Sequence, residues 1–583
     1  DCNMPLGGLT VDQLEEELSD FSCRFNGDEE FVEKMNAFSH QFHLEADDLI
    51  NEIITYATNL KKSDLDVAFL ESFELYYKKK KAPAPISKTR TVLADLKPTG
   101  TPRRNIKLDT SSMDVDDDPA EVSMSQFANV NAPQYLSEFI IQDAPSGPGW
   151  FVNRSDPGKV VSKLGGDVSR ERSATKSQLD VVVQPLTAAK KQTYGEPKAA
   201  GVLEGMNARL EAYGRDVRAA NAETLGEAPF AALNAEGESE VFIIGFVCEF
   251  DPRGDVSTIE LVRDEENGAV TVTVDVTALD ERCFFPGQMA VLKGVNRTGS
   301  MFEATSRLSA ERQKSVTVRT GDEDACVWVA VGPFTPPTTV AYEPLAEIVH
   351  RAREEQPDVL LLVGPLVDRQ SSFLLSKECT VTDDDLTHRL LTRIAKNMKG
   401  SSTRVLFMPS SSRDASVLPV FPGATLRQEW SGGVVDVVSD PVSLTVGGAQ
   451  IAVTASDILT HLSRCESHTS ANKENTDRMK RVAGHMLEQR SLYPLHPPSL
   501  STSLEGIHAA CSMNGQQPHM IVSPSMLAPF VKSPFGCVVA NPGTACKGSS
   551  AGTMLKMRIG LSEIPEEGTT SLERYTHVSV AKI

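Results

Sequence analysis

The sequence lacks paired cysteines, although it contains cysteine throughout. Ten cysteines are scattered between Cys2 and Cys546, and no two of them form a Cys-x-x-Cys pair. A dense disulfide framework is typical of small secreted domains, and a zinc site usually draws on closely spaced ligands. We therefore expect reduced thiols in an intracellular protein, with no metal ion and no other cofactor.

Long apolar runs and an excess of positive charge are also missing. No stretch of about 18 apolar residues occurs, so no membrane-spanning segment is expected. No basic segment followed by an apolar stretch opens the chain, so a secretory signal is not expected either. The formal net charge is −21. Because phosphate neutralisation supplies most of the affinity for nucleic acid, contact with DNA is expected to be weak or indirect.

The length of 583 residues suits several domains. Residues 1–80 carry apolar side chains at helical spacing, which predicts a small helical bundle. Residues 81–225 are rich in Pro, Ser, Thr, Gly, Ala and charge, which predicts a largely disordered tether. Short ordered pieces are expected within it near residues 135–141 and 159–164.

Two short patterns in the first half of the chain indicate regulation. Thr101 is followed by Pro102 and two arginines, so it is a candidate site for a proline-directed kinase, although such patterns also arise by chance. The basic residues 78–81 and 103–104 suit a nuclear import signal, and equally a solvated charge run.

The second half of the chain changes its periodicity twice. Residues 226–320 contain short strands separated by glycine turns, which predicts a small barrel of the OB type. Residues 321–583 alternate buried strands with helices, which predicts a largely parallel α/β sheet. The whole chain is therefore expected to be a multidomain α+β protein.

The expected strands of the α/β region end without the ligands of a calcineurin-like phosphoesterase. Such an enzyme holds two metal ions through aspartate, histidine and asparagine side chains at these strand ends. Here Pro365 stands where the first aspartate of a Gly-Asp-x-x-Asp element would be, and only Asp368 remains. The eight positions that we expect to be degenerate are Gly332, Pro333, Pro365, Asp368, Ser410, Asp414, Ser456 and Asp457. Catalytic and metal-binding residues are therefore not expected, and Asp368, Asp414 and Asp457 are interpreted as turn-forming residues.

These degenerate elements resemble one family in order along the chain. The resemblance covers about residues 238–583 and is carried by short motifs of glycine, proline and aspartate. The segments are Gly332-Pro333-Phe334-Thr335, Tyr342-Glu343-Pro344-Leu345, Gly364-Pro365-Leu366-Val367-Asp368, Pro409-Ser410 with Arg413-Asp414, Tyr493-Pro494-Leu495 and Asn541-Pro542-Gly543. They are similar to the signatures of the B subunits of DNA polymerase alpha.

The resemblance implies a catalytically inactive phosphoesterase domain on which the OB barrel packs. It also implies that these two parts bind the C-terminal domain of the polymerase catalytic subunit, within a nuclear complex that contains primase. The N-terminal bundle would recruit other replisome proteins. The residues of the subunit interface are not identified by the sequence.

Three alternatives remain open at this point. The chain could be the B subunit of polymerase delta or epsilon, although an N-terminal bundle with a long tether favours alpha over delta. It could be an active metallophosphoesterase with unusual ligands. It could also bind single strands through its barrel, but basic and aromatic residues are not interleaved there.

Overall fold

The computed structural model describes two compact units of the chain, residues 1–120 and 121–583. In the first unit it describes only scattered positions between residues 24 and 73. In the second it describes residues 133–140, 149–166, 179–185, 199–226, 229–249, 257–265, 268–376, 379–423, 426, 433–470, 477–513 and 515–583. No helix within these ranges combines the length and the apolar character needed to cross a membrane.

The described positions of the first unit fit part of the predicted bundle. Among these positions, Phe31, Met35, Ile53 and Phe69 are buried, as the apolar side chains of a bundle would be. The rings of Phe38 and Phe73 lie 5.3 Å apart. A short parallel pair, β1 (Arg24–Phe25) with β2 (Asp64–Leu65), was not predicted. The rest of the bundle, the tether from 81 to 132 and Thr101 lie outside the described residues.

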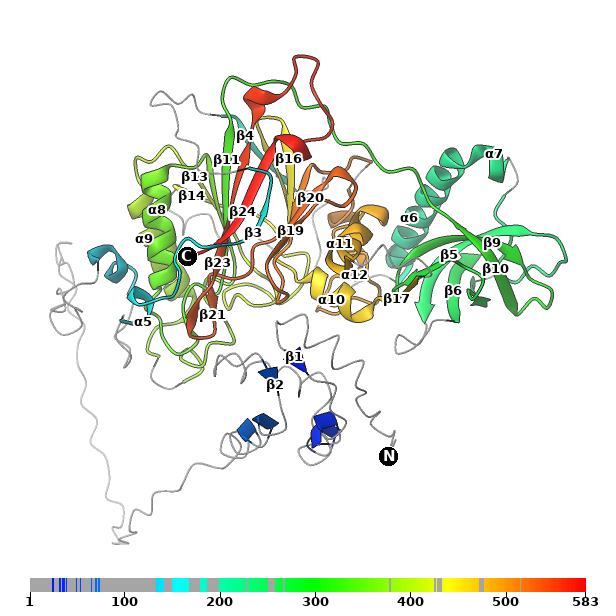
Figure 1. Cartoon of the computed structure of the whole chain (residues 1–583), viewed down its shortest axis with the longest axis horizontal. Coiled ribbons are helices and arrows are strands. Elements are labelled where there is room, and N and C mark those ends of the chain that lie inside the picture. Colours follow the sequence, from blue (N-terminus) through cyan, green and yellow to red (C-terminus); the bar gives the residue numbers. More distant parts are fainter. Residues whose placement is uncertain are drawn as a thin grey trace, which may run out of the picture. The chain divides into compact units, whose positions relative to one another are not determined.

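The body of the second unit contains two sheets (Figure 1). The first is seven-stranded, in the order β14-β13-β12-β11-β23-β24-β3. Its strands are β14 (Val435–Val437), β13 (Arg404–Met408), β12 (Val359–Val363), β11 (Ala325–Val331), β23 (Thr553–Ile559), β24 (Thr576–Lys582) and β3 (Val160–Leu164). β11 to β14 are mutually parallel. They were expected from continuous apolar runs, because a strand buried on both faces needs no alternation.

The second sheet has six strands in the order β19-β20-β18-β16-β15-β4. They are β19 (Phe530–Lys532), β20 (Val538–Asn541), β18 (Met520–Val522), β16 (Ala449–Val453), β15 (Val442–Val446) and β4 (Val181–Pro185). Strands β16, β18 and β20 are parallel to one another. Aliphatic side chains of both sheets form one buried cluster between them, so the two sheets pack face to face. A small antiparallel pair, β21 (Cys546–Lys547) with β22 (Ser550–Ala551), follows β20.

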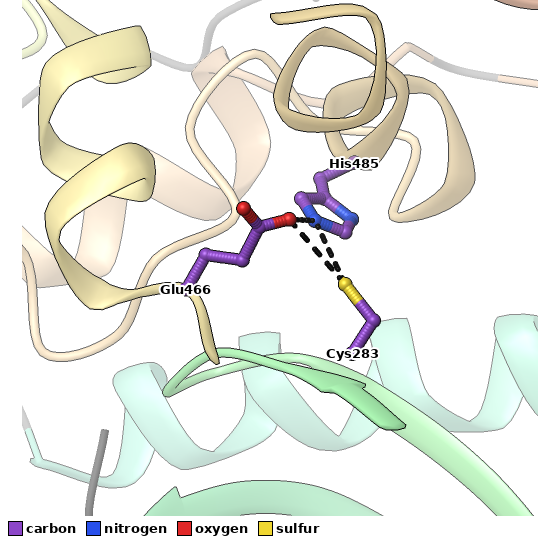
Figure 2. A group of neighbouring side chains, drawn as sticks. All are labelled: Cys283, Glu466 and His485. Atoms are coloured by element: carbon purple, nitrogen blue, oxygen red, sulfur yellow. Dashed lines mark hydrogen bonds and ion pairs between the residues drawn. The ribbon is translucent and has the colours of Figure 1, made fainter. Parts of the chain in front are cut away.

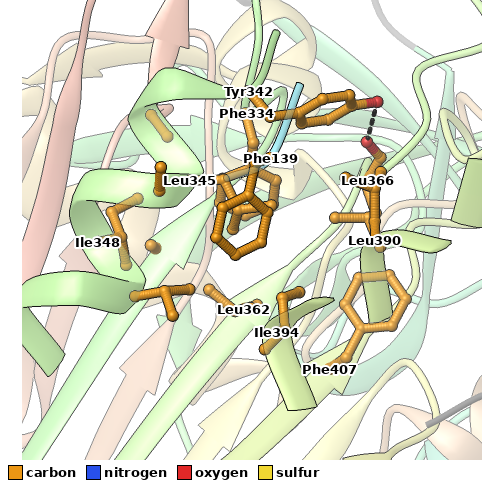
Figure 3. Packing of buried hydrophobic residues seen from close by; sticks show 14 of the residues in the cluster. Phe139, Phe334, Tyr342, Leu345, Ile348, Leu362, Leu366, Leu390, Ile394 and Phe407 are labelled. Carbon is orange, nitrogen blue, oxygen red and sulfur yellow. Dashed lines mark hydrogen bonds between the residues drawn. The ribbon is translucent and has the colours of Figure 1, made fainter. Parts of the chain in front are cut away.

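Helices cover the outer faces of both sheets. Helices α8 (Glu343–Glu355) and α9 (Asp383–Met398) pack on the seven-stranded sheet. Figure 3 shows the cluster beneath them, where Leu345 and Ile394 meet Leu362 and Phe407 of the sheet. Helices α10 (Ile458–Cys465), α11 (Arg478–Glu488) and α12 (Leu504–Ala510) cover the six-stranded sheet.

Helix α9 carries local signals at its start. The side chain of Thr382 accepts a hydrogen bond from Asp385 N at 3.3 Å, which satisfies one of the free amides of the first turn. Three aspartates occupy that turn, where negative charge favours the helix dipole. Local signals of this kind explain why its bounds could be predicted.

The barrel is a closed sheet in the order β10-β7-β6-β5-β9. Its strands are β5 (Val241–Glu249), β6 (Thr258–Glu265), β7 (Gly268–Asp275), β9 (Met289–Val295) and β10 (Met301–Leu308). Its interior is apolar and includes Phe284 and Phe302. A 22-residue helix, α6 (Ala199–Ala220), packs on the outside through Leu210 and Val217, followed by α7 (Ala222–Leu225).

The prediction that residues 81–225 are a largely disordered tether is wrong for its second half. The segment η2 (Gln134–Ser137) and the short helix α5 (Gly149–Val152) precede β3 and β4, which are edge strands of the two sheets. The side chains of Leu136, Phe139 and Phe151 are fully buried in the core. The two ordered pieces expected near 135–141 and 159–164 are present. The predicted boundary at 226 is also wrong, because α6 belongs to the barrel.

The barrel packs on the body, as the resemblance implied. Strand β8 (Glu281–Phe284), next to the barrel, pairs antiparallel with β17 (Ser467–Ser470) of the body. The amide of Gln489 bonds both backbone groups of Met289, at 2.7 Å and 3.2 Å. A side chain at Gly287 would place its Cβ 2.4 Å from His496 N, so only glycine allows this approach. Barrel and body therefore share a specific, closely fitted boundary.

Candidate functional site

The predicted degenerate positions meet at one edge of the body. The parallel strands β11, β12 and β13 are neighbours in the sheet, so the loops that follow them lie side by side. The amide of Gly332 donates to Val363 O at 2.8 Å, and that of Gly364 donates to Met408 O at 2.7 Å. The structure thus brings together six predicted positions, which are Gly332, Pro333, Pro365, Asp368, Ser410 and Asp414.

The two glycines are required by close packing of backbone on backbone. A Cβ at Gly332 would lie 2.0 Å from Pro365 O, and one at Gly364 would lie 1.9 Å from Asp414 Oδ2. Real Cβ atoms do not approach other heavy atoms so closely, so larger residues are excluded here. The Gly-Pro pairs therefore describe how tightly these loops are packed. Both Gly-Pro peptide bonds are cis.

The carboxylate of Asp414 accepts hydrogen bonds from the backbone amides of neighbouring loops. Its Oδ1 accepts from Leu366 N at 2.6 Å and Val367 N at 3.2 Å, and its Oδ2 accepts from Ser410 N at 2.6 Å. Burial raises the pKa of Asp414 to about 7, although these backbone hydrogen bonds act in the opposite direction. With both oxygens occupied, this carboxyl group ties the loops after β12 and β13 together.

Asp368 is paired with a cation of the neighbouring loop. Its Oδ2 accepts a hydrogen bond from Arg413 Nη2, and its Oδ1 accepts from Gln370 N at 3.1 Å. The side chain is one-tenth exposed. Both carboxylates thus accept hydrogen bonds from backbone amides of these loops, as turn-forming aspartates do.

Ser456 and Asp457 follow strand β16 of the other sheet. Asp457 caps helix α10, since its Oδ1 accepts from Thr460 N at 3.0 Å. Its Oδ2 accepts from Met526 N at 2.8 Å, which joins the loop after β18. Asp457 therefore links the start of α10 to the loop after β18. Ser456 is buried, and its amide donates to Thr454 Oγ1 at 3.1 Å.

Asp440 was missed by the sequence reasoning and connects the two sets of loops. Its backbone oxygen accepts from Gly423 N at 2.8 Å, and a Cβ at Gly423 would lie 3.6 Å from Ser411 Cβ. Its Oδ1 accepts from Thr454 Oγ1 at 2.8 Å and Ala455 N at 2.9 Å. Burial raises the pKa of Asp440 to about 7. A lone aspartate that opens an antiparallel strand carries no motif that would have revealed it.

A shallow hollow of about 170 Å³ lies at the same edge. It is lined by Pro333, Tyr342, Asp368 and Arg413, among other residues. The hydroxyl of Tyr342 donates to Leu366 O at 3.1 Å (Figure 3), and burial raises the pKa of this phenol. Two metal ions need several convergent carboxylate and imidazole ligands. The carboxylates here are already engaged by amides and by a guanidinium.

His519, which precedes strand β18, is a paired histidine. Its Nδ1 accepts from Gln450 N at 3.0 Å, and its Nε2 donates to Val316 O at 2.9 Å. Both ring nitrogens therefore have backbone partners. This histidine orders the connection between barrel and body.

A second cluster lies where barrel and body meet, and it was not predicted (Figure 2). Among the described residues, one group brings three potential metal-ligating side chains together, namely Cys283, Glu466 and His485. Glu466 Oε1 lies 2.7 Å from His485 Nε2 and 3.3 Å from Cys283 Sγ. Arg481 contacts both oxygens of Glu466, at 2.8 Å and 3.1 Å. Cys283 and His485 are 202 positions apart, so no local spacing could have shown this cluster.

The charges of this second cluster are strongly coupled. Burial alone raises the pKa of Glu466, but hydrogen bonds from His485 and Arg481 outweigh it and lower that pKa to about 2. Burial lowers the pKa of His485, yet its hydrogen bonds with Cys283 and Glu466 raise it well above the ordinary value. The cluster is therefore a buried group of paired charges.

Comparisons with known proteins relate three parts of this chain to polymerase subunits. Residues 327–532 match the family of the B subunits of DNA polymerases alpha and epsilon. Residues 12–80 match the N-terminal family of the DNA polymerase alpha B subunit. Residues 204–309 match the OB domain of the DNA polymerase alpha B subunit, a range that includes most of α6 as well as the barrel.

Two of the relatives described here span nearly the whole chain, and a third spans about half of it. The B subunit of DNA polymerase alpha from Caenorhabditis elegans is 26% identical over 593 residues, covering 98% of this chain and 99% of the relative. The Mus musculus protein of the same description is 27% identical over 588 residues and covers 94% and 95%. The Drosophila melanogaster protein is 29% identical over 277 residues, covering 47% and 44%.

Proposed function

Because the chain belongs to the family of DNA polymerase alpha B subunits, we propose that it is a non-catalytic scaffold subunit of the DNA polymerase alpha–primase complex. In this role the barrel and the body bind the C-terminal domain of the polymerase catalytic subunit. The complex synthesises primers at the initiation of DNA replication in the nucleus. The N-terminal region, residues 12–80, recruits other replisome proteins.

The hydrogen bonds made by the carboxylates at the sheet edge are the main support for this proposal. Asp414 holds three backbone amides, Asp457 holds two and Asp368 holds Arg413. A metal ion would have to displace each of these partners at a cost, because buried donors left without acceptors are destabilising. The strand ends are thus used for packing, which supports a role for the body as a surface for other subunits.

The matches to the N-terminal and OB families favour polymerase alpha over delta and epsilon, because both of these families are described for the alpha protein alone. The family that matches the body covers alpha and epsilon together. The test is co-purification of the tagged full-length chain from nuclear extract. We expect the polymerase alpha catalytic subunit and both primase subunits in the bound fraction. Recovery of another polymerase's catalytic subunit, or of none, would contradict the proposal.

The absence of catalysis can be tested separately. The full-length chain is incubated with a phosphodiester and manganese, and the Asp368→Ala variant is run beside it. We expect equal turnover at the level of the buffer, because Asp368 is occupied by Arg413. Turnover that is lost in Asp368→Ala would instead support an active metallophosphoesterase.

We also propose Thr101 as a phosphorylation site for a proline-directed kinase, because Pro102 follows it directly. Mass spectrometry of the chain isolated from dividing cells should find phosphate at Thr101. Its absence at every stage of the cell cycle would contradict the assignment.

A further inference from the structure

We propose that Cys283, Glu466 and His485 form a zinc-binding site that fastens the barrel to the body. Cys283 comes from β8, next to the barrel, whereas Glu466 follows α10 and His485 lies on α11. Figure 2 shows the three side chains converging from these separate elements. Nothing in the polymerase role of this chain calls for such a site, so the inference is independent of the proposed function.

The distances between the donor atoms are close to those of a tetrahedral zinc centre. Zinc lies about 2.0–2.3 Å from nitrogen, oxygen and sulfur ligands, so neighbouring ligands stand about 3.3–3.7 Å apart. Cys283 Sγ lies 3.3 Å from Glu466 Oε1 and 3.6 Å from His485 Nε2. The third distance, 2.7 Å between His485 Nε2 and Glu466 Oε1, would lengthen by about half an ångström to reach this range.

The ligand types favour zinc over the hard cations. A thiolate with an imidazole is the combination that selects zinc, whereas calcium and magnesium prefer oxygen alone. When the ion binds, the thiol proton of Cys283 and one imidazole proton leave. The two charges of zinc are then met by the thiolate and by the Glu466 carboxylate, so the buried group gains no net charge.

The outer neighbours of the cluster are also those of a metal site. A zinc-bound histidine commonly presents its other ring nitrogen to a carboxylate, which fixes the ring. His485 Nδ1 faces Glu488 Oε2 at 3.7 Å, an ion-pair distance that is longer than a hydrogen bond. Arg481 donates from Nε to Glu466 Oε1 at 2.8 Å and from Nη2 to Oε2 at 3.1 Å, so a zinc ion at Oε1 would share that oxygen with the guanidinium. Three protein ligands leave the fourth position to a water molecule.

The site would lie beside a strand pairing that joins barrel and body. Strand β8 reaches the body through its pairing with β17, and Cys283 stands directly opposite His468 in that pairing. A zinc ion at Cys283 would fix this pairing from the side. Loss of the ion should loosen the barrel without unfolding either sheet of the body.

The experiment uses the full-length chain purified without chelator from cells grown with added zinc. The number of zinc ions per chain is measured after desalting by inductively coupled plasma mass spectrometry. We expect about one zinc per wild-type chain, and loss of that zinc in Cys283→Ala and in His485→Gln. The matched control is Cys537→Ala, since Cys537 is equally buried in the body but stands outside this cluster. That control should keep its zinc.

Cobalt gives a second measurement that reports the sulfur ligand directly. Cobalt-loaded wild-type protein should show a thiolate-to-cobalt charge-transfer band, which Cys283→Ala removes and Cys537→Ala retains. If a variant fails to fold, the wild-type chain still decides the matter. Treatment with a chelator should then lower its unfolding temperature, and zinc should restore it. Zinc content in wild type no higher than in Cys283→Ala, or an unfolding temperature unmoved by chelator, would overturn the proposal.

Discussion

Two regions of this molecule bury acids, and they hold them differently. At the edge of the sheets, Asp414 and Asp440 accept hydrogen bonds from neutral backbone and hydroxyl groups. At the boundary of barrel and body, Glu466 is held by Arg481 and His485. The pKa is raised to about 7 for both aspartates and lowered to about 2 for Glu466.

The difference shows that burial by itself does not determine whether an acid stays charged. Neutral donors offset only part of the desolvation cost, so the protonated form of the aspartates is favoured at the sheet edge. Cationic partners reverse the balance at the boundary. The edge loops therefore tolerate protonation of their aspartates. The contact between barrel and body instead depends on Glu466 being charged.

The largest expected effect follows from neutralising the boundary acid. In protein treated with a chelator, Glu466→Gln would leave Arg481 and the protonated His485 without their counter-charge in a buried place. We expect a loss of about 3–5 kcal/mol in the free energy of unfolding, measured by urea denaturation of the full-length chain. Glu211→Gln is the control, because Glu211 pairs with Arg215 on an exposed helix face and should cost less than about 1 kcal/mol. Equal losses in the two variants would contradict this account.

The next effect concerns the close packing at the sheet edge. Gly364→Ala would place a methyl group 1.9 Å from Asp414 Oδ2 and 2.6 Å from Ser410 N. The resulting displacement of both loops should cost about 1–3 kcal/mol, with the same measurement. Gly237→Ala is the matched control, since no atom lies within 4 Å of a Cβ there. A stable Gly364→Ala variant would mean that these loops are looser than the structure indicates.

Asp414→Asn tests whether both carboxylate oxygens of Asp414 are needed to hold the backbone amides of the edge loops. The amide of asparagine offers one acceptor and turns its nitrogen towards a backbone N–H group. At least one of Leu366 N, Val367 N and Ser410 N would lose its partner. We expect a loss of about 1–3 kcal/mol in urea denaturation. A variant as stable as the wild type at all pH values would exclude the fastening role.

Asp440→Asn should have the smallest effect in acid, and the sign of its effect should depend on pH. Only Oδ1 of Asp440 accepts hydrogen bonds, since Oδ2 has no hydrogen-bond partner among the described residues, so asparagine can keep both bonds. The folded pKa is raised from 3.8 to about 7. The stability that Asp440 contributes is therefore present in acid and is lost as pH rises through this range.

The stability of the Asp440→Asn variant relative to the wild type should rise between about pH 5 and about pH 8. The urea midpoints of both proteins at the two pH values measure this gain. A constant difference between them would show that Asp440 does not titrate in this range.

The sequence predicted those elements whose signals are local. The buried parallel strands appear as runs of valine and leucine, and α9 is marked by its cap at Thr382 and its acidic first turn. The edge strands β3 and β4 lie in segments whose composition resembles a linker, and they gain their order from pairing with β24 and β15. Pairing of this kind depends on distant residues, so a local pattern could not reveal it.

The candidate site was also predicted only where local motifs mark its residues. The eight positions at the strand ends could be named because motifs of glycine, proline and aspartate mark them, and the three aspartates among them accept hydrogen bonds from loop amides or a guanidinium. Asp440 and the cluster of Cys283, Glu466 and His485 are single residues brought together by the fold. Only a three-dimensional arrangement could show them, because 183 positions separate Cys283 from Glu466.

Strands β3 and β4 have a practical consequence for anyone who shortens this protein. A fragment that begins at Ala199 would keep the barrel and most of both sheets, but β24 and β15 would lose their outer neighbours. Ser162 Oγ of β3, which accepts from Val531 N at 3.0 Å, would also be missing from the contact with β19. Open backbone edges recruit strands from other molecules, so such a fragment should aggregate, whereas one that begins before residue 133 should remain dispersed.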